Sequence, residues 1–328
     1  MLEKKHTITV LTFLILSTVL IAFSFTGNWD GGVYRQGAKK QGRRVNSEDS
    51  YLKAVSYFVL KQNKPLFTLN SDELTLNSSK EKSFFINPKG LVFTENGQKV
   101  NYEGLSGVFD QKSEVLTLER NVLLTTKDTE AVSNKMVYEA KNDRVHLTGE
   151  VKTKTFHAVE GDWIYIDSDE AYFWPQSRRS KYLGQVKGLI KRKRVYEDSM
   201  NFESNELYLD MNTHKADLTH DVLVKKQNLT ATSRRGEIFL ENYNKKLKYF
   251  ALYDDVKVIE KVMLDGKFIR RKAFSEKLEG LPSEEKIILT GYPKVYQLSD
   301  VIKGNRIVLR ENTEVVEVDD ANSKFKVE

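Results

Sequence analysis

The sequence of 328 residues contains no cysteine. This absence excludes structural disulfides, thiolate metal sites and thiol catalysis. It also excludes a lipid anchor of the type that is attached to an N-terminal cysteine. Any binding or catalysis must therefore depend on other side chains.

Proline and glycine are also few, with 5 and 18 residues, which excludes collagen-like and low-complexity material. Hydrophobic residues make up 40% of the chain and aromatic residues 11%, so a sizeable core can form. Charged residues of both signs make up 30% and leave a net charge of +6. This mild basicity favours acidic partners such as phosphates, anionic lipids or nucleic acid, but a solvated surface explains it better.

Motifs for enzymatic chemistry are missing as well. The sequence has no nucleophile elbow, no phosphate-binding glycine loop and no dinucleotide-binding fingerprint. His214 and His220 flank one predicted strand and turn, but strand spacing does not place them on one face as a metal site requires. The acidic stretch 162–170 lacks the glycine and the ligand spacing of a calcium loop. We therefore predict a protein that is not an enzyme and that holds no cofactor and no metal.

One short basic run, Lys191 to Arg194, is the strongest sign of nucleic-acid binding. In a strand these side chains would alternate between faces, and no aromatic residues interleave with them as in a base-stacking platform. A solvated hinge or a phosphate contact explains the run better, and we predict no nucleic-acid partner.

The longest uncharged run is TITVLTFLILSTVLIAFSF at residues 7–25. A helix of this length reaches roughly 28 Å, enough to cross the hydrocarbon core of a membrane. We predict a cytoplasmic tail at 1–6, a transmembrane helix at 7–25 and a linker at 26–50; a cleaved signal peptide is the alternative. Counting the flanking basic residues places the body in the cytoplasm, whereas the short tail and the β-rich body favour an extracytoplasmic body, which we predict.

From Tyr51 onward the pattern is a period-two alternation of apolar and polar residues, which indicates β-strands. One form recurs, namely a strand, a polar turn and a strand that opens with valine. We predict tight turns at Arg120-Asn121, Gly149-Glu150 and Asp254-Asp255, each joining two short strands. The valines after the turns lie 29 to 39 residues apart, a repeat that predicts stacked supersecondary units. They are Val122, Val151, Val186, Val222, Val256 and Val295.

In each predicted strand one set of alternate residues is apolar and the other is largely polar, as in strands with one buried and one wet face. Two facing sheets of such strands would enclose an apolar interior. This interior is either a packed core or a lipid groove, and periodicity does not distinguish the two. The candidate groove residues are Leu116, Leu118, Val145, Leu147, Leu207, Leu209, Leu218, Val224, Ile238, Leu240, Val256, Ile287, Leu289, Ile307 and Leu309.

Two groups of short motifs resemble families of lipopolysaccharide-transport proteins. The segments SYFVLKQNKPLFTLNSDELTL (56–76) and NPKGLVFTENGQ (87–98) resemble the LptC family. Two later segments resemble the LptA or OstA-like family: MNFESNELYLDMNTHKADLTHDVLVKKQNLTATSRRGEIFL (200–240) and IILTGYPKVYQLSDVIKGNRIVLRENTEVVEVD (287–319). In the first, His220 and Asp221 replace the usual glycine and asparagine of the turn. We therefore predict an LptC-like β domain at 51–190 fused to an LptA-like β domain at 191–328.

The resemblance implies an all-β fold, with an N-terminal transmembrane helix followed by antiparallel β-jellyroll or β-roll domains stacked into one continuous roll. It implies a single-pass anchor in the inner membrane with the body in the periplasm. The implied function is a bridge that accepts lipopolysaccharide from an inner-membrane ABC transporter and passes it towards the outer membrane. The edge near 56–70 would meet the transporter, and the edge near 305–318 another LptA-like domain or the outer-membrane translocon. The alternative is a structural or adhesive β-roll with a filled core that binds a protein or glycan.

Overall fold

A computed structural model of the chain describes residues 50–61, 64–94, 99–127, 129–155, 163–192, 199–240, 247–264, 266–311, 313 and 315–319. Residues 47–328 form one compact unit, separate from residues 1–46. The predicted tail, transmembrane helix and linker lie outside the described residues, apart from Ser50. Within the described part of the chain, no helix is long and apolar enough to cross a membrane.

The described chain is built almost wholly from strands, and its one helical element is a short 3-10 turn, η1, at Pro282–Glu284. The strands are β1 Ser50–Lys61, β2 Lys64–Leu76, β3 Lys82–Ile86, β4 Lys89–Phe93, β5 Lys99–Glu103, β6 Ser106–Asp110, β7 Val115–Thr125, β8 Thr129–Glu139, β9 Arg144–Thr155, β10 Trp163–Trp174, β11 Arg179–Lys191, β12 Met200–Asp210, β13 Lys215–Lys226, β14 Leu229–Leu240, β15 Leu247–Leu264, β16 Lys267–Leu281, β17 Lys286–Thr290, β18 Lys294–Gln297, β19 Asp300–Lys303, β20 Arg306–Arg310 and β21 Val316–Asp319.

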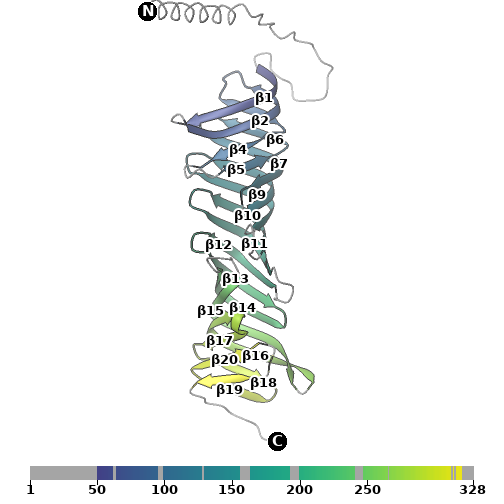
Figure 1. Cartoon of the computed structure of the whole chain (residues 1–328), viewed down its shortest axis with the longest axis vertical. Coiled ribbons are helices and arrows are strands. Elements are labelled where there is room, and N and C mark those ends of the chain that lie inside the picture. Colours follow the sequence, from purple (N-terminus) through teal and green to yellow (C-terminus); the bar gives the residue numbers. More distant parts are fainter. Residues whose placement is uncertain are drawn as a thin grey trace, which may run out of the picture. The chain divides into compact units, whose positions relative to one another are not determined.

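All strand pairs are antiparallel and belong to one sheet. From β6 to β17 each strand pairs with the next in the chain, so the strands stack in sequence order (Figure 1). The prediction of an all-β antiparallel fold is therefore confirmed. Across the predicted domain boundary near residue 191 the ladder continues, because β11 pairs with β12 over residues 179–190 and 200–210.

Most of the long strands are bent in the middle, and the bend divides the sheet into two halves. The A half contains β4, β5, β18, β19 and residues 122–125, 129–133, 151–155, 164–168, 186–191, 200–204, 222–226, 229–233, 256–264 and 267–275. The B half contains β3, β6, β17, β20, β21 and residues 115–119, 135–139, 144–148, 170–174, 179–183, 206–210, 215–219, 235–240, 247–253 and 277–281.

A pair of residues with positive φ forms the bend in each odd-numbered strand from β7 to β15. In β7 these are Arg120 (φ 66°) and Asn121 (φ 51°), and the register with β8 shifts between Glu119 and Val122. The pairs in the other four strands are Gly149–Glu150, Gly184–Gln185, His220–Asp221 and Asp254–Asp255. Each shift is a β-bulge, which bends a strand and increases its local twist.

The predicted tight turns at Arg120-Asn121, Gly149-Glu150 and Asp254-Asp255 are therefore wrong. These residues lie in the middle of single strands of 11 to 18 residues, and not between pairs of short strands. Hairpin turns of type I′ also need two consecutive residues with positive φ. The local sequence therefore fits both structures, and only the pairing with neighbouring strands decides between them.

In the even-numbered strands the bend carries a buried serine. The hydroxyls of Ser133, Ser168, Ser204, Ser233 and Ser275 each donate a hydrogen bond to the backbone carbonyl two residues later, at 2.8 to 3.1 Å. The repeated valines Val122, Val151, Val186, Val222 and Val256 follow the bends of the odd strands directly, and all are buried. The repeat in the sequence thus marks the bend of every second strand.

Apolar residues from both halves fill the space between them. Two inward positions hold glycine, and a phenylalanine ring on the paired strand covers each one: Phe202 covers Gly188, and Phe250 covers Gly280. A Cβ atom on Gly188 would lie 1.9 Å from the ring of Phe202. The core is therefore packed closely enough for two aromatic rings to lie against bare backbone.

Candidate functional site

All fifteen candidate groove residues are buried on the inner face of the bent sheet. Some of them converge on one small cavity between the halves: Leu207, Leu209, Ile238 and Leu240 from the B half face Ile164, Ile166, Ile190 and Phe202 from the A half. The interior is thus one apolar core built from residues of both halves.

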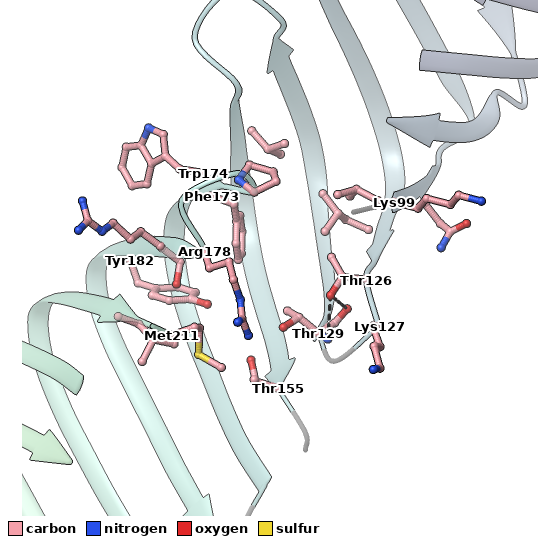
Figure 2. A pocket seen from close by; sticks show the side chains of 18 residues that line it. Lys99, Thr126, Lys127, Thr129, Thr155, Phe173, Trp174, Arg178, Tyr182 and Met211 are labelled. Atoms are coloured by element: carbon pink, nitrogen blue, oxygen red, sulfur yellow. Dashed lines mark hydrogen bonds between the residues drawn. The ribbon is translucent and has the colours of Figure 1, made fainter. Parts of the chain in front are cut away.

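In each half, the strand ends that lie away from the bends form a margin, which we call the A margin or the B margin. A larger cleft of about 690 Å³ opens where the two margins face each other. The A margin contributes residues of β5, β7, β8 and β9, including Lys99, Thr126 and Thr155. The B margin contributes residues of β9, β10, β11 and β12 (Figure 2). A cleft of this volume falls within the usual range for ligand-binding pockets.

The wall of the cleft is apolar and aromatic. Val100, Leu124, Val145, Tyr182 and Leu209 form its buried part. Half-buried Phe173, Trp174 and Met211 extend this wall towards the surface, and Figure 2 shows them on the same side of the cleft as Tyr182. Leu209 lines both the cleft and the small inner cavity, so this one side chain lies between the two.

The rim of the cleft is basic. The exposed residues Lys99, Lys127, Arg178 and Arg179 line it, and no acidic side chain among the described residues does. Arg179 forms an ion pair with Asp210, with 3.1 Å between its Nε and the Oδ2 of the carboxylate. The cleft therefore offers an apolar wall below cationic groups, which suits an anionic amphiphile.

Burial raises the pKa of Tyr182 in the cleft wall, because a phenolate would lose its hydration there. The hydroxyl of Tyr182 therefore stays neutral, and its ring contributes apolar surface. The edge-on contact with Phe173, with ring centroids 5.8 Å apart, fixes the orientation of both rings.

Further along the chain a buried ion pair joins the same two margins. Lys226 ends β13 in the A half, and Glu311 follows β20 in the B half. Their Nζ and Oε2 atoms are 2.5 Å apart, and both side chains are at least nine-tenths buried. Burial raises the pKa of the Glu311 carboxyl, although the ammonium of Lys226 acts to lower it. The two margins are thus apart at the cleft and in contact at the Lys226–Glu311 ion pair.

A second buried ion pair supports the first. The guanidinium of Arg271, 1% exposed, donates to Oε2 of Glu260 from Nη2 at 2.6 Å and from Nε at 3.2 Å. Nη2 of Arg271 also donates to the carbonyl of Arg310 at 3.3 Å, directly before Glu311. Arg271 on the A half therefore also contacts the B half.

Comparison with protein-family models divides the chain in two. Residues 10–155 match the model described as lipopolysaccharide-assembly, LptC-related. Residues 201–315 match the model of the LptA/(LptD N-terminal domain) LPS transport protein. The chain joins an LptC-related region to an LptA-like region.

Among solved structures, the chain is similar to LptH, the LptA-homologous periplasmic component of the lipopolysaccharide transport device from Pseudomonas aeruginosa. The two share 13% sequence identity with a TM-score of 0.35, over 39% of this chain and 95% of LptH. Comparison with curated protein sequences gives no match.

The cleft and the ion pairs fall differently on the two regions. The A margin of the cleft, from Lys99 to Thr155, lies in the LptC-related region, and Leu209 and Met211 lie in the LptA-like region. Lys226, Glu311 and the supporting pair all lie in the LptA-like region. We call the line along which the two margins face each other the seam. The cleft, where the seam is open, extends from the LptC-related region to the LptA-like region, and the ion pairs close the seam within the LptA-like region.

The sequence reasoning missed most of the cleft. Of the predicted groove residues only Val145 and Leu209 line it. Phe173, Met211 and the basic rim residues lie at strand ends and in turns, where alternation gives no signal. The dipeptide Arg178-Arg179 between two strands was a visible but unspecific sign.

The described residues contain no cluster of three or more histidine, aspartate or glutamate side chains that could hold a metal ion. His214 precedes β13 and His220 lies at its bend. In the acidic stretch, Glu170 contacts Nε2 of His146 at 3.1 Å and the hydroxyl of Tyr172 at 3.2 Å. In the basic run, Lys191 ends β11, and residues 193 and 194 lie outside the described residues.

Proposed function

We propose that this chain is a periplasmic bridge component that carries lipopolysaccharide away from the inner membrane. The observation that carries the proposal is the lateral cleft: its wall is apolar and borders the buried core at Leu209, and its rim is basic. The matches to an LptC-related and an LptA-like family in one chain support the same function.

The need for such a bridge follows from the hydrophobic effect. Exposing one methylene group to water costs about 0.8 kcal/mol, so an acyl chain of about twelve carbons costs roughly 10 kcal/mol. A lipid with several acyl chains therefore needs a continuous apolar path between two membranes. A bent sheet supplies this path without any chemical step.

The two parts of the cleft divide the work. Acyl chains would pack on Phe173, Tyr182 and Met211 and reach inward to the candidate groove residues beyond Leu209. The phosphates of the lipid would stay outside, near Lys99, Lys127 and Arg178. The sugar chain would remain in water beside the seam.

The bridge would be held at the inner membrane by residues 7–25 and would use its open sheet edges for assembly. Edge strands present unpaired backbone groups to a partner strand. The edge at β1 would meet the ABC transporter, where ATP hydrolysis takes place. The C-terminal edge would meet another LptA-like domain or the outer-membrane translocon. Because the two regions share one chain, their contact is intramolecular and does not depend on protein concentration.

Photo-crosslinking in cells tests the proposal. A benzophenone amino acid at Phe173 or Met211 should form an adduct with lipopolysaccharide. The control is Tyr253, an aromatic residue half-buried on the outer face of the B half, where no adduct is expected. The bridge function is wrong if transport proceeds without adducts at Phe173 and Met211, or with equal adducts at Tyr253. The structural or adhesive β-roll would then be the better explanation.

A further inference from the structure

The outer face of the A half near the C-terminal end of the sheet has an unusual composition. There β15, β16, β18 and β19 lie side by side (Figure 1). Their exposed outward side chains are basic, aromatic or aliphatic. We call this surface the basic face, and its members are Lys257, Lys261, Met263, Phe268, Arg270, Lys272, Phe274, Lys294, Tyr296 and Lys303.

The register brings like charges directly opposite each other on this face. Lys261 on β15 pairs with Arg270 on β16, and Lys294 on β18 pairs with Lys303 on β19. Like charges at directly opposed positions destabilise a sheet. None of the six cations of the basic face forms an ion pair with a residue of the described chain. The described chain therefore supplies no anion for these cations, and we expect the anion to come from another molecule.

The outer face of the B half is different. Several of its lysines have carboxylate partners on the same or the adjoining strand: Lys181–Glu206, Lys215–Glu237 and Lys277–Glu279, each at 2.8 Å. Acidic residues lie at the borders of the basic face. Asp255, which pairs with Arg234, precedes Lys257 on β15; Glu276 follows the face on β16, and Asp300 begins β19. The basic face thus gathers, on four neighbouring strands, six cations that have no ion-pair partner among the described residues.

Large apolar side chains lie exposed among these cations. Phe268 is 68% exposed and pairs with the exposed Met263 near the tip of the β15–β16 hairpin. Phe274 and Tyr296 stack edge to face, with ring centroids 5.9 Å apart. Leu298, also 68% exposed, follows β18 directly. Basic residues mixed with exposed aromatic and aliphatic side chains are the composition of interfacial membrane-binding surfaces.

We propose that the basic face binds the surface of a bilayer that contains anionic phospholipid. The cations would lie among the lipid phosphates, and Met263, Phe268 and Leu298 would enter the headgroup layer. A single-stranded nucleic acid would also satisfy the charge and could stack on the aromatic rings. Methionine and leucine offer no ring for stacking, so the apolar part of the face favours lipid. This binding is separate from lipopolysaccharide carriage in the cleft.

The test uses the full chain reconstituted into phosphatidylcholine proteoliposomes that are fixed on beads. Labelled vesicles are then added, either of phosphatidylcholine alone or of phosphatidylcholine with phosphatidylglycerol. The beads should capture only the vesicles with phosphatidylglycerol, and added salt should weaken the capture. Equal capture of both vesicle types, or capture that salt does not change, overturns the proposal.

Variants locate the binding on the molecule. Lys261→Gln with Arg270→Gln removes two cations and should lower the apparent affinity for anionic vesicles about 30-fold, at the usual contribution of a basic residue near an anionic surface. Phe268→Ser leaves the charge unchanged and should also reduce capture. Lys112→Gln with Lys141→Gln is the matched control, because it removes two exposed cations from turns elsewhere.

Two further outcomes contradict the proposal. In one, the Lys261 and Arg270 variant captures anionic vesicles as well as the control variant does. In the other, a labelled single-stranded oligonucleotide binds the face and anionic vesicles do not. Thermal unfolding of each variant shows that it is folded, and lipopolysaccharide crosslinking at Met211 reports separately on the cleft.

Discussion

Single residues decide where the seam between the two sheet margins is joined. Lys226 and Glu311 are 85 positions apart in the sequence, and they meet because the bend brings the margins together. A buried ion pair is weak as a source of stability, because desolvation offsets most of the attraction. Removing one partner is costly, however, since it leaves an uncompensated buried charge. The pair therefore acts on which margins meet more than on total stability.

A double-mutant cycle tests this view. Lys226→Met or Glu311→Leu alone should reduce the free energy of unfolding by about 3–5 kcal/mol. Together they should restore most of this loss, because no charge is left unpaired. The measurement is denaturant unfolding of the four proteins of the cycle.

The exposed pair Lys277–Glu279, with each side chain 37% exposed, provides the control. Lys277→Met should cost under about 1 kcal/mol, as for other surface ion pairs. If the two single variants at Lys226 and Glu311 cost no more than this, the pair does not hold the margins.

At the scale of elements, the bends give the sheet its interior. At two bends a residue of an even strand lies against a glycine of the next odd strand: Asn134 of β8 against Gly149 of β9, and Asp169 of β10 against Gly184 of β11. Gly184 has a φ of 75°, and a Cβ atom there would lie 2.3 Å from Oδ2 of Asp169. The bend therefore constrains Gly184 both by its backbone conformation and by the space around it.

Two glycine variants separate these constraints. Gly266 in the β15–β16 hairpin also has a φ of 75°, but no described atom lies within 4 Å of the place where its Cβ would be. Gly266→Ala should therefore cost about 1 kcal/mol from backbone strain alone. Gly184→Ala should cost about 1–3 kcal/mol more, because of overpacking at the bend. Thermal unfolding measures both, and equal losses would show that the bend is not tightly packed.

The strands and their inward faces could be predicted from the sequence, and the seam could not. Alternation identifies Leu116 or Ile238 as inward residues because side chains of a strand alternate between faces. It cannot tell a bulge at Arg120-Asn121 from a hairpin, since both need positive φ. It also says nothing of strand ends such as Thr126 and Arg178, whose meeting depends on how the whole sheet bends.

At the scale of the molecule, the described sheet has an unpaired edge at each end. β1 pairs only with β2, and β21 pairs only with β20 among the described residues. β1 also carries exposed apolar side chains such as Phe58 and Leu60. Open edges of this kind join to other strands. We therefore expect copies of the chain to join end to end when no other partner is present.

The absence of cysteine makes this expectation simple to test. In a mixture of Ser56→Cys and Glu317→Cys variants, oxidation should give disulfide-linked dimers whose yield rises with protein concentration. Replacing Ser56→Cys by Lys112→Cys, in an exposed turn, should abolish the dimers. Equal yields from both mixtures would mean that the two edges do not meet.

The line of bends has a mechanical consequence for the whole sheet. Every strand from β7 to β16 crosses from the A half to the B half through its own bend. The bends therefore form one hinge line, and the seam lies opposite to it. Neighbouring strands share a continuous hydrogen-bond ladder, and a guest that spreads the margins at one strand strains the hinges beside it. If the chain carries lipid as proposed, we therefore expect the seam to open locally around each guest, a few strands at a time, and not along its whole length at once.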